Sequence, residues 1–139
     1  MIVLDTNVIS EVFRPEPNTR VVEWLESLTG EVAITAVTLA ELLAGVRRLP
    51  NGRRRSTLSA RIDSALKPYR DAGVLLPFDD EAADHYADVL VARERVGRPI
   101  STADAQIAAI CRAHRASLAT RNIQDFSGTG VDLVDPWDD

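Results

Sequence analysis

Cysteine is almost absent from the 139-residue sequence, which contains only Cys111. One thiol cannot form an internal disulfide, so a disulfide-stapled fold is excluded and a reducing, cytoplasmic compartment is favoured. Long apolar runs are also missing, and none approaches the roughly 20 residues that a membrane helix requires. The apolar start of the chain meets Asp5 too early for a signal peptide. We therefore expect a cytoplasmic protein with no membrane partner.

Several familiar cofactor sites are missing as well. The seven glycines are scattered, so neither common type of glycine-rich phosphate loop is present. His85 has no second ligand at a zinc spacing, and Cys111 and His114, which share a helix face, are typical of core packing. Neither histidine has a serine or cysteine arranged for a catalytic triad. The net charge is −5, and an acidic chain is poorly suited to coating nucleic acid through many phosphate contacts.

The remaining composition is typical of one folded domain. Apolar residues make up 45% and charged residues 27% of the chain, far from the disordered regime. A chain of this length buries roughly 68–70% of its unfolded surface, which is enough for a core without disulfides or structural metals. We therefore expect a single domain over residues 1–139.

Apolar runs alternate with helical periodicity along the whole chain. The runs predict strands at 2–4, 31–35, 74–78, 116–120 and 131–134, and the periodicity predicts helices at about 6–13, 18–28, 38–49, 56–71, 80–96 and 101–115. Pro68 is expected to kink or split the fourth helix. Strands separated by whole helices pair in parallel with right-handed crossovers. The fold class is therefore α/β, a three-layer α/β/α sandwich with a short, mainly parallel central sheet.

Four acids are expected at the same end of this sheet. Asp5 ends the first strand, Glu41 lies in the first turn of the helix after the second, Asp104 begins the helix that leads into the fourth, and Asp125 lies in the loop after the fourth. The crevice beyond the carboxyl ends of parallel strands is where open α/β sheets bind ligands. These acids are the candidate functional residues.

Each acid also has a structural explanation. Asp5 suits a helix N-cap, and Thr38–Glu41 fits a capping box. Asp104 fits this explanation least, because its helix is apolar almost all round and its carboxylate therefore points inward. A buried carboxylate needs a cation, a metal or a proton, and no Lys or Arg is nearby in sequence. An all-oxygen site of this kind suits Mg²⁺ or Mn²⁺, which can activate water against a phosphodiester.

Basic charge is concentrated in one segment. Five arginines lie within nine residues, namely Arg47, Arg48, Arg53, Arg54 and Arg55. This run is either a solvated helix end and loop or a surface for phosphates or for a protein partner, and the sequence leaves both open.

Four segments in order along the chain resemble the motif regions of PIN-domain ribonucleases, and more narrowly those of VapC/FitB-type toxins of bacterial toxin–antitoxin pairs. They are IVLDTNV (2–8), TLAEL (38–42), DAQIAA (104–109) and LATRNIQDF (118–126). The resemblance covers essentially the whole chain. It implies a small α/β sandwich that cuts RNA with Mg²⁺, for which Mn²⁺ can substitute.

Further expectations follow from the resemblance. Asp5 and Asp104 are the implied metal ligands, supported by Thr6, while Glu41 and Asp125 complete the catalytic acids. Asn122 competes with Asp125 for the fourth role, and Arg121 is a further candidate for holding RNA phosphates. Such toxins are held inactive by a cognate VapB-type antitoxin and form homodimers, so both partners are expected here.

Two other interpretations compete with a nuclease. A phosphatase of the haloacid-dehalogenase type needs a second Asp where Asn7 stands, and a receiver-type phosphoacceptor needs a lysine near the fourth strand, whereas the single Lys67 lies far upstream. A non-catalytic binding module would retain the acids as helix caps. Titration with a divalent metal separates this module from a nuclease, because the module should neither cleave RNA nor melt at a higher temperature with metal.

Overall fold

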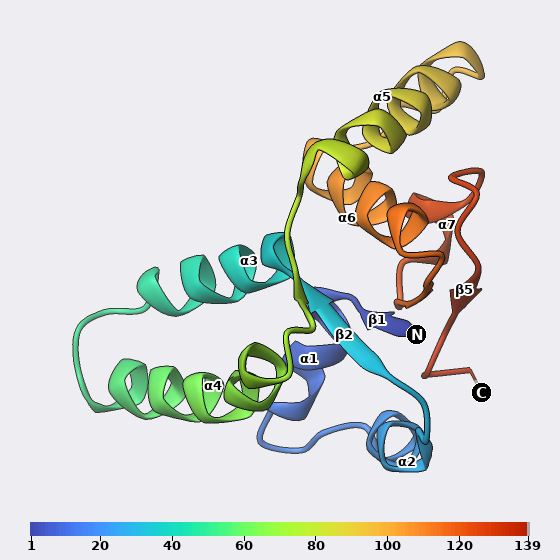
Figure 1. The fold of residues 1–139 in the computed structure, drawn as a ribbon. Helices are drawn as coiled ribbons and strands as arrows, with labels where there is room; N and C mark the ends of the chain where they lie inside the picture. The colour runs from blue at the N-terminus through green and yellow to red at the C-terminus, as the bar shows by residue number, and fades with distance from the viewer. Residues whose placement is uncertain (139) are drawn as a thin grey trace.

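A five-stranded, entirely parallel sheet forms the centre of the computed structural model, which describes residues 1–138 (Figure 1). The strands are β1 (Ile2–Leu4), β2 (Val32–Thr35), β3 (Leu75–Leu76), β4 (Ser117–Ala119) and β5 (Leu133–Val134), in the order β3-β2-β1-β4-β5. In the central register, Ile2 lies opposite both Val32 and Ser117. The α/β class predicted from the sequence is confirmed.

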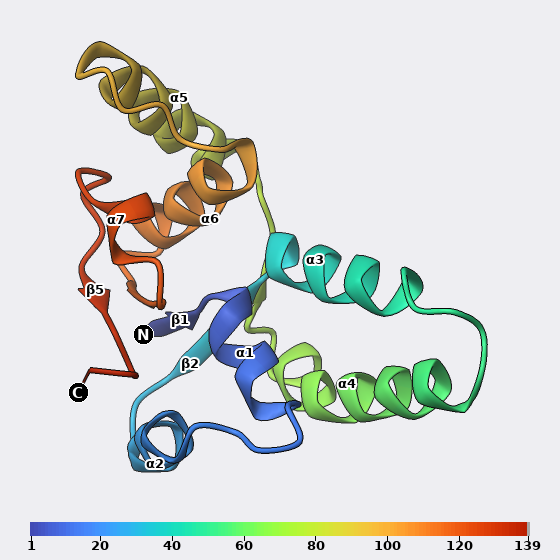
Figure 2. The ribbon, with the colours of Figure 1, turned by 180° about the vertical axis from the view of Figure 1, so that it is seen from behind.

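Helices cover both faces of the sheet. They are α1 (Thr6–Val12), α2 (Thr19–Ser27), α3 (Ala36–Arg47), α4 (Arg53–Asp71), α5 (Asp80–Arg95), α6 (Thr102–Ala113) and α7 (Ile123–Phe126). The first four supply one hydrophobic cluster and the last three supply the other. Figures 1 and 2 show α3 and α4 extending side by side away from the sheet, and α5 lying over α6. No helix within residues 1–138 is both long and apolar enough to cross a membrane.

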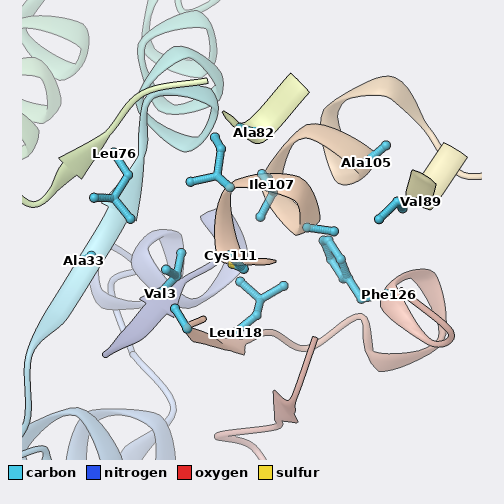
Figure 3. Packing of buried hydrophobic residues seen from close by; sticks show 13 residues of the cluster. Val3, Ala33, Leu76, Ala82, Val89, Ala105, Ile107, Cys111, Leu118 and Phe126 are labelled. Atoms are coloured by element: carbon cyan, nitrogen blue, oxygen red, sulfur yellow. The ribbon is translucent and has the colours of Figure 1, made fainter. Parts of the chain in front are cut away.

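Side-chain alternation along the strands explains the two clusters. Val3 and Leu118 point to the layer of α6, where Figure 3 shows them beside Cys111. Their neighbours Leu4 and Ala119 point to the opposite layer. Successive residues of a strand face opposite sides of a sheet, so a strand buried on both sides must be apolar throughout. This is why Val3, Leu4, Leu118 and Ala119, the residues at the centre of the sheet, are all apolar.

Most helix starts agree with the sequence prediction. Asp5, Asn18, Asp79 and Ser101 all act as N-caps, each accepting a hydrogen bond from a backbone N–H of the first turn. The start of α3 was predicted wrongly. Thr35, the last residue of β2, is the cap, because its hydroxyl accepts from the backbone N–H of Thr38 at 3.1 Å. Glu41 therefore lies in the second turn of α3 rather than the first.

Four further details differ from the prediction. Helix α4 begins at Arg53 rather than Ser56, and Pro68 does not split it. Pro68 lies in the last turn, where the helix loses one N–H donor but continues to Asp71. The strand expected at 74–78 is only Leu75–Leu76, since Pro77 cannot donate to a ladder. Asp125 lies in the single-turn helix α7 rather than in a loop.

The strand order places a topological switch point at the centre of the sheet. The chain runs from β1 outwards to β2 and β3 on one side, and β4 and β5 lie on the other. The ends of β1 and β4 are neighbours, because Leu4 pairs with Ala119. Ligands of open parallel sheets bind beyond such a pair of carboxyl ends. The residues that follow, Asp5 and Thr120, therefore lie where a site is expected.

Candidate active site

Asp5 is a buried carboxylate with fixed hydrogen-bond partners. It is only 5% exposed, and its Oδ1 accepts from the backbone N–H of Thr6 at 2.8 Å. Its Oδ2 accepts from the hydroxyl of Thr120 at 2.8 Å, across from the end of β4. The hydroxyl of Thr120 in turn accepts from the backbone N–H of Asn122 at 3.0 Å. The orientation of Asp5 is therefore set by both central strands.

The surroundings of Asp5 destabilise the negatively charged form of its side chain. Burial raises the pKa of Asp5 above its usual value of 3.8, and the hydrogen bonds from Thr120 and Thr6 oppose that rise. The nearby charges of Asp104 and Glu41 raise the pKa of Asp5 further. A divalent cation would relieve both the burial cost and the repulsion.

Glu41 comes to the same place from α3. Its side chain is exposed, and its Oε1 accepts from the hydroxyl of Thr6 at 2.8 Å. The Thr6 Oγ1 also lies 3.4 Å from that of Thr38, which lies 3.3 Å from that of Thr35. Thr35 and Thr38 are fully buried. Thr6 was expected to support Asp5; its backbone does so, while its hydroxyl holds Glu41 at the end of a row of threonine hydroxyls.

Asp104 is half-buried in the first turn of α6. Its backbone N–H donates to the hydroxyl of Ser101 at 3.2 Å. Burial raises the pKa of Asp104, a hydrogen bond with Ser101 lowers it, and the charges of Asp125 and Glu41 raise it again. Because Asp104 also raises the pKa of Asp5, it is electrostatically coupled to all three other acids.

Asp125 reaches the group from α7. Its side chain is exposed, and its negative charge acts on Asp104. Its backbone carbonyl accepts from Nη1 of Arg93 at 2.8 Å. The competing Asn122 takes part through its backbone N–H to Thr120. The structure therefore brings together all four acids chosen from the sequence, each from a different element.

The donor chemistry of this site fits a hard divalent cation. All four acids offer carboxylate oxygens, the ligand type that Mg²⁺ and Mn²⁺ prefer. No three His, Cys, Asp or Glu side chains within residues 1–138 form a ready-made metal cage. Mg²⁺ does not require one, since it usually keeps several waters and binds through one or two carboxylates. The site therefore fits an ion held by two carboxylates and water.

A groove leads away from the acids between α1, α3 and α4. Thr6 and Glu41 line one end of a cavity of about 310 Å³, and Arg14 and Arg54 also line it. A neighbouring hollow shares Arg54 and adds Arg53. The arginine-rich segment is therefore divided. Arg54 lines the cavity that Glu41 also lines, Arg53 lines the neighbouring hollow, and the other arginines of the segment lie outside these two linings.

Arg121, which follows β4, contacts the side chain of Trp137. The guanidinium carbon of Arg121 lies 5.0 Å from the centre of the Trp137 ring. The carbonyl of Trp137 accepts from Nη1 of Arg20 at 3.0 Å. Arg121, proposed from the sequence as a phosphate ligand, thus stacks on an aromatic ring beside the candidate site.

Comparison with known proteins agrees with this geometry. The model of the family described as "PIN domain" matches residues 2–130. The chain is 44% identical to "Toxin FitB" of Neisseria gonorrhoeae, with both proteins covered completely. It is 40% identical to "VapC ribonuclease Y4jK" of Sinorhizobium fredii, with 99% of each covered. The crystal structure of FitAcB from Neisseria gonorrhoeae superposes with a TM-score of 0.92 at 43% identity, covering 99% of each chain.

Proposed function

The chain belongs to the PIN domain family, and from this premise we propose that it is a metal-dependent endoribonuclease that acts as the toxin of a toxin–antitoxin pair. The similarity to a toxin and to a VapC ribonuclease extends over the whole chain, which supports this function. It also supports a single PIN domain over residues 1–139. The observation that carries the proposal is that the charges of Asp5, Glu41 and Asp125 all interact with that of Asp104, at the switch point of the sheet.

We propose that Asp5 and Asp104 hold a Mg²⁺ ion, for which Mn²⁺ can substitute. When bound, such an ion lowers the pKa of water and stabilises the leaving oxygen of a phosphodiester. Asp5 contributes a carboxylate oriented by Thr6 and Thr120. Asp104 contributes the acid that couples to every other member of the cluster. Both are less stable as anions than free carboxylates are, which favours binding of a cation.

Glu41 and Asp125 complete the catalytic acids in this proposal. Glu41 is exposed, so its carboxylate can hydrogen-bond and orient water at the edge of the site. The hydroxyl of Thr6 keeps it in that place. Asp125 lies on the opposite side, on α7, and adds negative charge beside Asp104. In-line attack of water on RNA then leaves a 5′-phosphate and a 3′-hydroxyl.

The proposed partners are RNA, a VapB-type antitoxin and a second copy of the chain. The relative named a toxin supports an antitoxin partner. Arg54 lines the cavity that Glu41 also lines and Arg53 lines the neighbouring hollow, so both are candidates to contact either RNA phosphates or the antitoxin. A homodimer is carried over from the family resemblance, and sedimentation of the purified chain tests it.

Mapping of cleaved RNA ends tests the proposed function. The chain is expressed briefly without an antitoxin, and new 5′-phosphate ends in total RNA are compared with those from an Asp104→Asn variant. We expect new ends from the wild-type chain alone, and cleavage by the purified protein that stops on chelation and returns with Mg²⁺ or Mn²⁺. Equal ends from both chains would exclude this nuclease, and no ends from either would favour the non-catalytic module.

A further inference from the structure

Arg93 is a buried cation that forms no ion pair with a carboxylate in the part of the chain that the structure describes. It lies in the last turn of α5 and is 6% exposed. The ion pairs found within residues 1–138 join Arg14 to Glu11 and Lys67 to Asp71, so neither involves Arg93. Burying a guanidinium is strongly unfavourable unless its donors are satisfied and its charge is balanced. Its place in the structure therefore requires an explanation.

The donors of Arg93 are directed at backbone carbonyls. Nη1 donates to the carbonyl of Asp125 at 2.8 Å and to that of Ser127 at 3.0 Å. Nε donates to the carbonyl of Arg98 at 2.7 Å. Two of these carbonyls belong to the end of α7 and the residue that follows it. Arg93 thus joins the α5–α6 connection to the segment that carries Asp125.

Helix α7 depends on such support, because a single turn is too short to be stable alone. Its one deep anchor is Phe126, which is fully buried and packs in the cluster with Val89 and Ala105 (Figure 3). Phe126 fixes the depth of the turn, and Arg93 binds the carbonyl groups on its other side. Together these contacts determine where the exposed carboxylate of Asp125 lies.

The positive charge of Arg93 also acts on Asp104 in the acidic cluster. Among the groups that act on Asp104, Arg93 is the cation that lowers its pKa, against the charges of Asp125 and Glu41. This cation comes from α5, eleven residues before Asp104 in the sequence, and its hydrogen bonds go to backbone carbonyls.

We propose that Arg93 is a positioning residue of the acidic site, which clamps the α7 turn through the carbonyls of Asp125 and Ser127 and thereby fixes where the Asp125 carboxylate lies. The inference rests on the proposed ribonuclease function. A structural role alone would also make Arg93 important for stability. It would not make the effect of Arg93 on cleavage depend on the Asp125 carboxylate.

A double-mutant cycle separates these roles. Arg93→Met, Asp125→Asn and the combined variant are compared below their melting temperatures, with Arg95→Gln as the matched control, since Arg95 is exposed in the same turn. Arg93→Met should lower kcat for a short RNA about 10–100-fold at saturating Mg²⁺, and Arg95→Gln should leave it unchanged. On the Asp125→Asn background, Arg93→Met should cost less than about 3-fold more. If the kcat loss of the combined variant equals the product of the two single-variant losses, the proposal is overturned.

Arg93→Lys and amide hydrogen exchange complete the test. Lysine keeps the charge but not the two-carbonyl fork, so Arg93→Lys should recover part of kcat. It replaces Arg93→Met in the cycle if the methionine variant does not fold. In metal-free protein, the amides of residues 122–127 should exchange faster in Arg93→Met than in Arg95→Gln, and equal exchange would contradict the clamp. If the wild type cleaves no RNA, the proposed function fails, while exchange still decides whether Arg93 holds α7.

Discussion

At the scale of single residues, the site is defined by carboxylates in places that disfavour their charge. Asp5 is almost fully buried, and the carboxylate of Asp104 interacts electrostatically with each of the other three acids in the cluster. In each case burial is the largest cause of the raised pKa. These carboxylates therefore lower the free energy of unfolding of the metal-free protein, and a bound cation raises it again.

Replacing Asp104 should therefore stabilise the metal-free protein. Its folded pKa is raised above the usual 3.8, so the folded state loses stability relative to the unfolded state as pH rises from below 3.8 through the raised value. Above that window the loss is constant. Asp104→Asn should melt a few degrees higher than the wild type at pH 7 in EDTA, and the difference should shrink below pH 3.8. A lower melting temperature at pH 7 would contradict the electrostatic explanation.

Thr120 should matter because it supports a buried anion. Thr120→Val keeps the shape of the side chain but removes the donor to Oδ2 of Asp5. A hydrogen bond to a charged group contributes about 1.5–3 kcal/mol, so chemical denaturation at pH 7 should show a loss of about that size. The control is Thr19→Val, on an exposed residue at the start of α2. Equal losses in the two variants would show that the bond to Asp5 contributes nothing.

At the scale of elements, four of the five arginines in the arginine-rich segment form two pairs in different surroundings. Arg53 and Arg54 line the hollows near α1, whereas Arg47 and Arg48 are exposed at the end of α3. This division offers a matched comparison within one segment of the chain.

Neutralising the first pair should weaken binding more than neutralising the second. If Arg53 and Arg54 contact RNA, Arg53→Gln with Arg54→Gln should reduce the slope of log K against log salt by about 1.4, since each single-strand phosphate contributes about 0.7. If they contact the antitoxin, the Kd of the antitoxin should rise while the RNA slope stays unchanged. Arg47→Gln with Arg48→Gln is the control. Equal binding of both ligands by both double variants would make the segment merely solvated surface.

Local sequence signals explain why much of this site was predictable. Asp5 follows an apolar run that predicts a central strand, and Asp104 stands at the start of an apolar segment that predicts a buried helix. The positions of both acids could therefore be predicted from patterns within a few residues. The start of α3 was misplaced because Thr35 and Thr38 are both good caps, and only the hydrogen bond between them identifies the first. The Asp5 bond to Thr120 spans 115 positions. The Arg93 bond to Asp125 spans 32 positions, so neither bond leaves a local pattern.

At the scale of the whole molecule, the fold places charge repulsion where a ligand can remove it. The parallel sheet brings the ends of β1 and β4 together, and helices from both layers add acids to that edge. The apolar clusters on the two faces stabilise this arrangement against the repulsion at the site.

Metal binding should therefore raise the free energy of unfolding of the whole domain. An ion that binds the folded state alone stabilises it by about 2.7 kcal/mol at a concentration 100 times its Kd. The wild-type melting temperature should rise with Mg²⁺ or Mn²⁺, and above the Kd it should keep rising with the logarithm of the ion concentration. Asp5→Asn and Asp104→Asn should lose that rise, whereas the exposed control Asp63→Asn on α4 should keep it. An undiminished rise in Asp104→Asn would place the ion elsewhere.

Anomalous diffraction from a crystal soaked in Mn²⁺ tests the central claim most directly. The measurement locates the ion itself, independently of any RNA substrate or assay. We expect an anomalous peak within coordination distance of carboxylate oxygens of both Asp5 and Asp104, and no such peak in an Asp104→Asn crystal. A fully soaked wild-type crystal with no peak there, or with Mn²⁺ bound only at other acids, would contradict the assignment of this site.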